Sequence, residues 1–289
     1  MILIADSGST KTDWRLIDEQ KKIHQFATQG LNPYFQTSKQ ISEILKSELI
    51  PQLDSSFSHL TSHISYLISH IFFYGAGCKA DSKKEIVKTA LNESFPKSII
   101  EINTDLLGAA RALCGTNPGI AAILGTGSNT CYYDGSSIIE NRASLGYALG
   151  DEGSGAHIGK TFVQAYLNKE MPADLATRFY ERFKLSTDDI LDAIYKQPMP
   201  NRFLASFSKF IYQNIKEQYV IDLIVGCFEQ FFDKHICKYS QHKEVKLSCT
   251  GSVAFYYSNI LRAVATNKGV AIETIVETPI AGLTLYHLR

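Results

Sequence analysis

The sequence predicts an α/β protein made of two related lobes. Strand and helix patterns alternate along the chain, which is typical of this fold class. One strand-turn-strand segment also occurs twice, 119 residues apart. The chain has 289 residues, enough for two domains of ordinary size. A glycine- and proline-containing stretch at 115–119 marks a boundary, so we expect an N-terminal lobe at 1–115 and a C-terminal lobe at 116–289.

The first copy of the repeated segment spans residues 2–18, where one apolar run ends at Asp6 and another resumes at Trp14. Between them lies a turn of small and polar residues, Ser7, Gly8, Ser9, Thr10, Lys11 and Thr12. Glycine lets the backbone approach an anion, and the neighbouring amides, hydroxyls and lysine can donate to phosphate oxygens. Asp6 would face the same place, where a carboxylate is useful if a hydrated Mg²⁺ lies beside the phosphate. Taken alone, this segment is explained equally well by a plain β-hairpin.

The second copy, at residues 120–135, favours the phosphate interpretation. Its turn contains Gly125, Thr126, Gly127 and Ser128. When the two segments are aligned with a shift of 119 residues, Tyr133 corresponds to Trp14, and apolar runs flank both turns. Chance similarity of two glycine turns is the alternative, and the matching flanks argue against it. Two such turns, each opening one half of the chain, predict two lobes that face each other across a nucleotide cleft.

The other elements follow from local patterns. In the first lobe we expect strands at 21–26, 64–74 and 99–102, and helices at 37–49, 82–95 and 106–114. Aromatic residues recur at helical spacing between 172 and 239, which predicts helices packed on the second sheet, in a helical insertion at about 155–240. Strands at 245–249 and 270–276 follow. A small-residue helix from 279 ends the chain and is able to pack back on the N-terminal lobe.

The composition of the chain limits which kinds of partner the protein is expected to bind. Lys plus Arg and Asp plus Glu both number 29, so bulk charge does not favour nucleic acid or an anionic membrane, and we expect a small ligand. We expect neither a membrane span nor a secretion signal, because apolar runs stay short and Asp6 interrupts the first one. The six cysteines lack C-x-x-C spacing, which suggests reduced thiols in a cytoplasmic protein.

Two further glycine-rich segments carry polar groups. Residues 145–155 are too rich in glycine for a regular element, and the acidic pair Asp151 and Glu152 suits a loop that grips a polyhydroxy ligand. An acidic surface turn is the alternative. The late Thr250-Gly251-Ser252 follows a strand, and a glycine there leaves room for a flat ring against the backbone.

With these segments in place, the chain resembles the BadF/BadG/BcrA/BcrD-type ATPase family, and within it the N-acetylglucosamine kinases of the sugar-kinase/actin superfamily. The resemblance covers nearly the whole chain. It rests on five segments in the expected order: 5–13, Asn103-Thr104-Asp105 with its alanine-rich helix, 123–129, 146–154 and 250–252. It implies a ribonuclease-H-like fold in both lobes (an actin-like ATPase fold), with ATP in the cleft between them.

The resemblance also implies residue roles. Residues 7–12 and 125–128 would hold the ATP phosphates, Asp6 would lie near Mg²⁺, and Gly251 and Ser252 would border the adenosine. Asp105 occupies the position of the catalytic base. Sugar-binding points would be Asn32, Gly75, Ala76, Tyr147 and Asp151. Family members often carry Trp where this chain has Tyr147, which leaves the acceptor open.

The expected activity is therefore transfer of the ATP γ-phosphate to N-acetylglucosamine, at its 6-hydroxyl, in an enzyme that could form a homodimer. N-acetylmuramate and glucosamine are alternative acceptors. A second alternative is an ATP-driven activator with an iron–sulfur cluster, for which Cys114 and Cys131 are the nearest candidates. A third is a nucleotide-binding sensor without catalysis.

Overall fold

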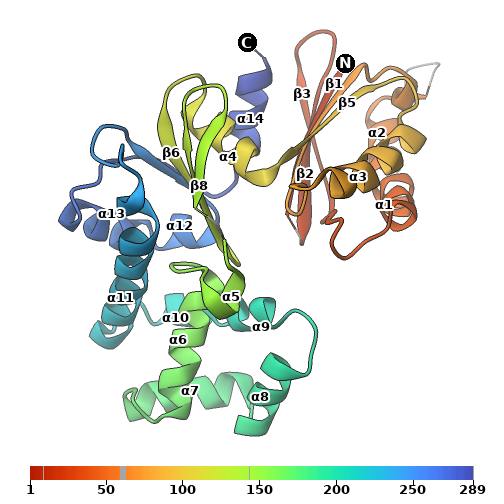
Figure 1. Cartoon of the computed structure of the whole chain (residues 1–289). Coiled ribbons are helices and arrows are strands. Elements are labelled where there is room, and N and C mark those ends of the chain that lie inside the picture. The colour runs from red at the N-terminus through yellow and green to blue at the C-terminus, as the bar shows by residue number, and fades with distance from the viewer. Residues whose placement is uncertain (9, 59–62, 143, 289) are drawn as a thin grey trace. The chain divides into compact units, whose positions relative to one another are not determined.

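A computed structural model of the chain describes residues 1–8, 10–58, 63–142 and 144–288. Its contacts divide the chain into two units. One consists of Met1–Gly115 with Pro279–Arg289, and the other of Thr116–Thr278. Each unit contains one five-stranded mixed sheet with helices around it (Figure 1). The predicted α/β class with one sheet per lobe is confirmed.

The sheet of the first unit has the order β3-β2-β1-β4-β5. Its strands are β1 (Ile2–Ser7), β2 (Lys11–Ile17), β3 (Ile23–Gln29), β4 (His70–Gly75) and β5 (Ile99–Thr104). The first three form an antiparallel meander, and β4 and β5 run parallel to β1.

The sheet of the second unit has the same topology, β8-β7-β6-β9-β10. Its strands are β6 (Gly119–Leu124), β7 (Ser128–Tyr133), β8 (Ile138–Arg142), β9 (Leu247–Thr250) and β10 (Ile272–Val276). Here too a three-stranded meander is extended by two strands parallel to the first. The repeated strand-turn-strand segment therefore marks a repeat of the whole sheet.

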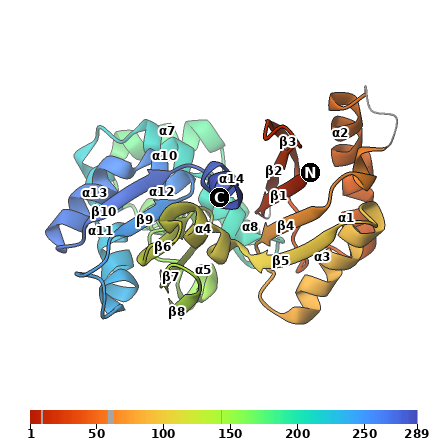
Figure 2. The same cartoon turned by 90° about the horizontal axis from the view of Figure 1, so that it is seen from above.

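Helices cover both faces of the first sheet. They are α1 (Ser38–Ile44), the π-helical turn η1 (Leu45–Leu49), α2 (Ile50–Ser56), the 3-10 turn η2 (Ile64–Tyr66), α3 (Asp81–Ser94), α4 (Asp105–Cys114) and α14 (Ile280–His287). The larger core lies between the sheet and α1 to α3. On the other face, Ile280 and Leu283 of α14 pack on Ile4 and Tyr74. The last helix also lies along α4, as Figure 2 shows from above.

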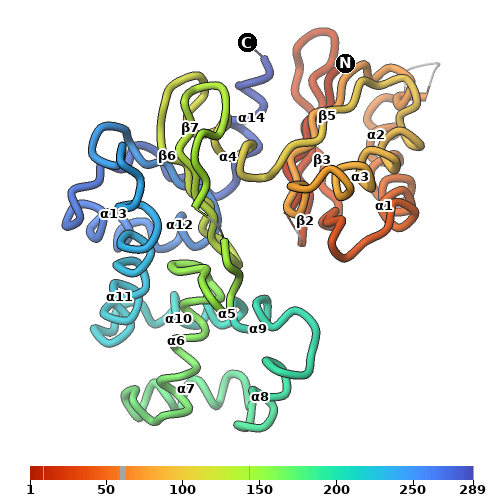
Figure 3. The backbone as a smooth tube through the Cα atoms, in the orientation of Figure 1, coloured from red at the N-terminus to blue at the C-terminus, as the bar shows by residue number. Residues whose placement is uncertain are grey.

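The second unit contains a large helical layer, whose path is clearest in Figure 3. Its helices are α5 (Gly146–Leu149), α6 (Gly155–Leu167), α7 (Ala173–Phe183), α8 (Thr187–Tyr195), α9 (Pro200–Ser206), α10 (Ser208–Gln213), α11 (Gln218–Lys234), η3 (Ile236–Lys238), α12 (Ser252–Tyr256) and α13 (Ser258–Asn267). The aromatic stripes do form core. Phe179 is buried, and the rings of Phe162, Phe207 and Phe210 lie with their centroids 5.2 to 5.5 Å from its own.

Two expected elements differ in the structure. The strand expected at 64–74 begins only at His70, where pairing with Ile2 starts, and its first residues form the turn η2 instead. The segment 145–155 contains the short helix α5, although it was expected to be irregular. In the described ranges, no helix is both long and apolar enough to cross a bilayer.

Candidate active site

The first unit brings its predicted acidic residues to one edge of the sheet. Strands β1, β4 and β5 are parallel, and their last residues Ser7, Gly75 and Thr104 are aligned in register. Asp6 is the penultimate residue of β1, and Asp105 follows β5 as the first residue of α4. Ligands of open α/β sheets bind at the carboxyl ends of the strands. The fold therefore places Asp6 and Asp105 where such a ligand would lie.

Both carboxyl groups have pKa values above the usual range for aspartate. Burial, and then the negative charges of Asp105 and Asp13, raise the pKa of Asp6 to about 7. Asp13 is directly opposite Asp6 in the pairing of β1 with β2. Burial also raises the pKa of Asp105, although its carboxylate accepts a 2.8 Å hydrogen bond from the Leu106 amide. A raised pKa in a carboxyl group at a strand end suits a residue that must accept a proton.

The donor set of this edge matches the chemistry of Mg²⁺. In phosphate-transfer sites, Mg²⁺ keeps several waters and binds one or two carboxylates together with the substrate phosphates. Asp6, Asp13 and Asp105 offer carboxylate oxygens whose mutual repulsion a divalent cation would reduce. Within the described residues, no group of three or more His, Cys, Asp or Glu is arranged to hold a metal ion alone. The residues thus fit a cation shared with a phosphate.

Removing the Asp6 carboxyl group should change how stability depends on pH. The pKa of Asp6 is about 7 in the folded protein and 3.8 in its usual state, so the folded chain binds more protons between these values. The Asp6 carboxyl therefore disfavours folding increasingly as the pH rises from about 4 to 7. Without divalent cations, the free energy of urea unfolding of the wild type should fall relative to Asp6→Asn by on the order of 2 kcal/mol between pH 5 and 8. A constant difference would contradict a crowded acidic site.

Two hydroxyl groups attach the first glycine turn to the end of β3 and the residues that follow it. Ser7 and Thr12 are buried, and their hydroxyl oxygens lie 2.7 Å apart. Ser7 Oγ donates to the carbonyl of Leu31, and Thr12 Oγ1 donates to that of Gln29, both at 3.1 Å. We expected these hydroxyls to face a phosphate. The structure instead engages them within the protein, because the end of β3 closes over them.

The outer part of the same turn is open. Gly8, Thr10 and Lys11 are exposed, whereas Ser9 lies outside the described residues. Lys11 Nζ forms a 2.7 Å ion pair with Asp13, the residue opposite Asp6. The Gly8 amide donates to the Lys11 carbonyl at 3.0 Å and closes this turn. The Lys11 ammonium beside the acidic edge and the exposed Thr10 are the groups here that remain suited to a phosphate.

The predicted sugar-binding points of the first unit also lie together. Asn32 is buried, and a side chain at Gly77 would collide with its amide oxygen. Gly75 ends β4, and the next amide, that of Ala76, donates to the carbonyl of Ser7 at 2.8 Å. The end of β1, the turn after β4 and Asn32 therefore adjoin one another.

In the second unit, the glycine turn is bonded to the start of α6. The Gly125 amide donates to the Gly127 carbonyl at 3.0 Å and closes the turn. The amides of Gly155 and Ala156 donate to the carbonyls of Gly125 and Thr126, at 2.8 and 3.0 Å. The turn at 125–128 and the glycine-rich segment before α6, which are separate motifs in the sequence, are thus parts of one structure.

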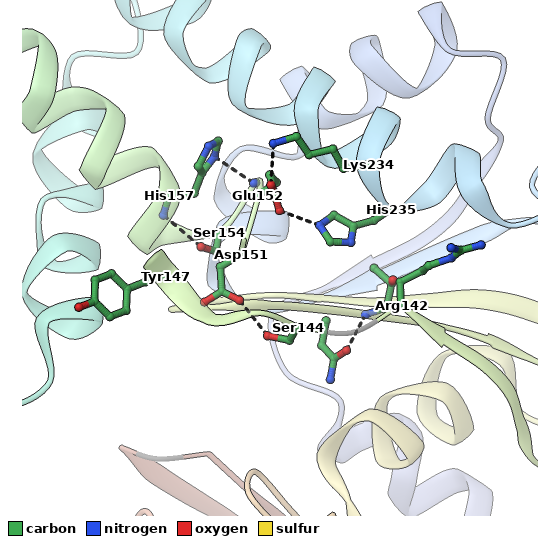
Figure 4. Close-up of polar contacts among 12 residues, drawn as sticks. Arg142, Ser144, Tyr147, Asp151, Glu152, Ser154, His157, Lys234 and His235 are labelled. Carbon is green, nitrogen blue, oxygen red and sulfur yellow. Dashed lines mark hydrogen bonds and ion pairs between the residues drawn. The ribbon is translucent and has the colours of Figure 1, made fainter. Parts of the chain in front are cut away.

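The Asp151 carboxylate lies beside this turn, and Figure 4 shows it directed at Ser144. Ser144 Oγ donates to its carboxylate at 2.9 Å, and the backbone of Ser128 also hydrogen-bonds to it. The carboxylate is so close to Gly127 that a side chain there would come within 3.0 Å of it. Burial raises the pKa of Asp151, and the hydrogen bonds from Ser144 and Ser128 partly offset the rise.

The side chain of Tyr147 points in a different direction from that of Asp151. It is half-buried on α5, and Lys160 Nζ donates to its carbonyl at 2.9 Å, which holds α5 against α6. Figure 4 shows its ring turned away from the Asp151 carboxylate. The structure thus brings Asp151 to the glycine turn and leaves the ring of Tyr147 to the side.

The late Thr250-Gly251-Ser252 segment touches the same turn. Gly251 has φ 113°, and a Cβ there would lie 2.3 Å from the Leu124 carbonyl oxygen, so only glycine fits. Ser252 is exposed at the start of α12. The Thr250 hydroxyl is buried and, within the described part of the chain, has no hydrogen-bond partner. Such a group is usually satisfied by a ligand or water.

Sequence reasoning missed Ser144 and the role of the Thr250 side chain. A polar residue that ends an apolar strand was a usable signal for Thr250, but nothing local marks Ser144.

Two surface hollows, of about 240 Å³ beside Asp18 and about 480 Å³ beside Tyr219, contain none of the predicted site residues. We take the strand ends as the candidate site, because the acidic residues, Lys11 and the two glycine turns lie there.

The paired sheets and the acidic strand ends define an actin-like ATPase fold of the sugar-kinase type. Among solved structures, a proposed N-acetylglucosamine kinase from Porphyromonas gingivalis is 41% identical, with a TM-score of 0.91, over 99% of this chain and 98% of its own. The chain belongs to the same family as that protein.

More distant structures share the fold alone. A proposed N-acetylglucosamine kinase from Chromobacterium violaceum is 16% identical, with a TM-score of 0.75, over 99% of this chain and 98% of its own. A ROK-family glucokinase from Streptomyces griseus, solved with glucose and AMPPNP, is 13% identical, with a TM-score of 0.57, over 99% and 97%. No protein-family profile matches the chain, and neither does any curated protein. The BadF/BadG/BcrA/BcrD-type assignment stays a prediction.

Proposed function

We propose that this protein is an ATP-dependent amino-sugar kinase that transfers the γ-phosphate of ATP to N-acetylglucosamine, at the 6-hydroxyl. Membership of the family identified above supports a phosphotransferase with a hydroxyl acceptor. The observation that carries the proposal is that Asp6 and Asp105 lie at the aligned ends of β1 and β5, each with a raised pKa.

Asp105 would act as the general base. A sugar hydroxyl is a weak nucleophile, so a carboxylate must orient it and accept its proton as the new P–O bond forms. Asp105 is suited to this role because β5 and the first turn of α4 fix its backbone. Its raised pKa brings proton affinity closer to what transfer at neutral pH needs.

The nucleotide phosphates would bind at the two glycine turns. Most catalysis in phosphoryl transfer comes from positioning and from stabilising charge on the transferred group. Lys11, the exposed Thr10 and the turn at 125–128 would supply that stabilisation. Gly251 and Ser252 would border the adenosine, where the Thr250 hydroxyl offers a further donor.

Asp6 would hold Mg²⁺, with Asp13 and Asp105 near it. When bound, the cation would neutralise charge on the phosphate oxygens. The ion pair of Lys11 with Asp13 would keep the lysine beside the same phosphates.

The sugar would be bound by Asn32 and the turn at 75–77 from the first unit, and by Asp151 from the second. A buried carboxylate bonded to Ser144 has an acceptor oxygen fixed for a sugar hydroxyl. Tyr147 stays a predicted part of the sugar site, although its ring is turned away from the Asp151 carboxylate. Exclusion of bulk water from these groups when the substrates bind would limit ATP hydrolysis.

The test is ADP release from Mg-ATP with a panel of N-acetylglucosamine, N-acetylmuramate, glucosamine, N-acetylmannosamine and glucose. We expect N-acetylglucosamine to have the highest kcat/KM, and ³¹P-coupled NMR of the product to place the phosphate on the 6-oxygen. If no sugar raised ADP release above the sugar-free rate, the proposal would fail. If another amino sugar gave the highest kcat/KM, the kinase class would stand and the acceptor would change.

A further inference from the structure

We propose that Glu152 is a positioning residue. Held between Lys234 and His235 at the end of α11, it fixes the loop that presents Asp151 to the acceptor. The inference rests on the proposed function, in which Asp151 contacts the sugar. Glu152 itself points to the opposite side of the loop and would not touch substrate.

The contacts of Glu152 form a closed ion-pair cluster (Figure 4). Its side chain is only 8% exposed. Lys234 Nζ lies 2.8 Å from Oε1, and His235 Nε2 lies 2.9 Å from Oε2, so both carboxylate oxygens are engaged. Lys234 is the last residue of α11, and His235 is its C-cap. The loop is thereby attached to the end of a long helix.

The cluster keeps Glu152 ionised. Burial raises the pKa of Glu152, but the hydrogen bonds from Lys234 and His235 outweigh it and lower the pKa to about 2. A buried carboxylate that loses its partners is strongly destabilising, because the remaining charge is neither solvated nor paired. The geometry of the loop is therefore coupled to this cluster.

The backbone on either side of Glu152 shows what the cluster holds in place. Asp151 has φ 58° and Gly153 has φ 76°, both in the left-handed region. For a residue with a side chain, such as Asp151, this backbone conformation is disfavoured, and the contacts around it must hold it in place. Gly153 packs so closely on α11 that a Cβ would lie 2.8 Å from that of Phe231, and its amide donates to His157 Nδ1 at 3.2 Å.

The side chains of Asp151 and Glu152 leave the loop in opposite directions. Glu152 reaches α11, and Asp151 reaches Ser144 and the backbone of Ser128. If Glu152 loses its charge, Asp151 can relax to an ordinary backbone conformation. Its carboxylate would then leave the glycine turn, and the acceptor would lose a fixed contact.

The first test is Glu152→Gln, which keeps the shape and removes the charge. We expect KM for the sugar to rise by about tenfold or more, while KM for ATP stays within about twofold. Lys234→Met should shift the sugar KM in the same direction, and it serves if the first variant does not fold. Lys268→Met is the matched control, because it removes the 2.7 Å ion pair between Lys268 and Asp233 of α11 and leaves both partners of Glu152 in place. It should change neither constant.

A double-mutant cycle separates positioning from a general structural role. If Glu152 acts through Asp151, then Glu152→Gln should change the sugar KM by less than about twofold once Asp151→Asn is present. Additive effects of the two substitutions on the sugar KM would overturn the proposal.

Hydrogen exchange tests the same inference without substrate. In Glu152→Gln, amides of 144–155 should exchange at least about tenfold faster than in the wild type, while those of α7 and α8 stay unchanged. Unchanged exchange of 144–155 would overturn the positioning role of Glu152, even if the protein is a kinase. Faster exchange in a protein that binds no sugar would support the role of Glu152 in holding the loop and would reject the proposed function.

Discussion

Replacing Asp105 by Asn should lower kcat by about 10³-fold or more while leaving the affinity for Mg-ATP within about threefold. The amide keeps the shape and can still accept the Leu106 hydrogen bond, but it cannot take up the proton of the acceptor hydroxyl. Turnover is measured by coupled ADP release, and nucleotide affinity by isothermal titration with a non-hydrolysable analogue.

The matched control is Glu101→Gln on the same strand, where the side chain is exposed. Its turnover should equal that of the wild type. Full activity of Asp105→Asn would remove Asp105 as the base. Loss of nucleotide affinity together with turnover would indicate instead that Asp105 helps to hold the nucleotide or its cation.

Gly251→Ala should destabilise the second unit by about 3 kcal/mol or more and weaken ATP binding in the fraction that folds. The added methyl group would lie 2.3 Å from the Leu124 carbonyl oxygen, and the backbone at φ 113° disfavours any side chain. The strand end that precedes the glycine turn at 125–128 would have to move. Urea unfolding and nucleotide titration report the two effects separately.

Gly226→Ala in α11 is the control for the same chemical change. Apart from the helix's own backbone, no atom of the described residues lies within 4 Å of a Cβ at Gly226, so alanine should be neutral or stabilise the helix by about 0.5–1 kcal/mol. A Gly251→Ala variant as stable as this control would show that the contact between the turn and β6 is less tight than the structure indicates.

Much of the fold could be predicted because its signals are local. The apolar runs that end at Asp6 and Leu124 marked the first strand of each sheet, and the repeat between them predicted two sheets of one kind. Strand β8 was not predicted, because its alternation is weak and one face of Ile138–Arg142 stays exposed. The residues at 64–67 read as strand, but pairing with β1 starts later, at His70.

Some residues of the candidate site could be predicted from local sequence patterns, and others could not. Asp6 could be predicted because an apolar run ends there, and the family resemblance pointed to Asp105 at the start of a helix. Ser7 and Thr12 belong to the same motif, yet their hydroxyls are buried against Leu31 and Gln29. Composition of a turn shows which donors it has, whereas tertiary packing decides which of them remain available.

The sequence by itself determined the two glycine turns, the strands that carry them and the acidic residues beside them, because these depend on local periodicity and turn chemistry. Only the tertiary structure decided that α14 packs on α4 and that Lys234 and His235 close on Glu152. Those partners lie more than 80 residues apart in the chain. Contacts of that kind form when distant segments pack around a common core, and no spacing in the sequence records them.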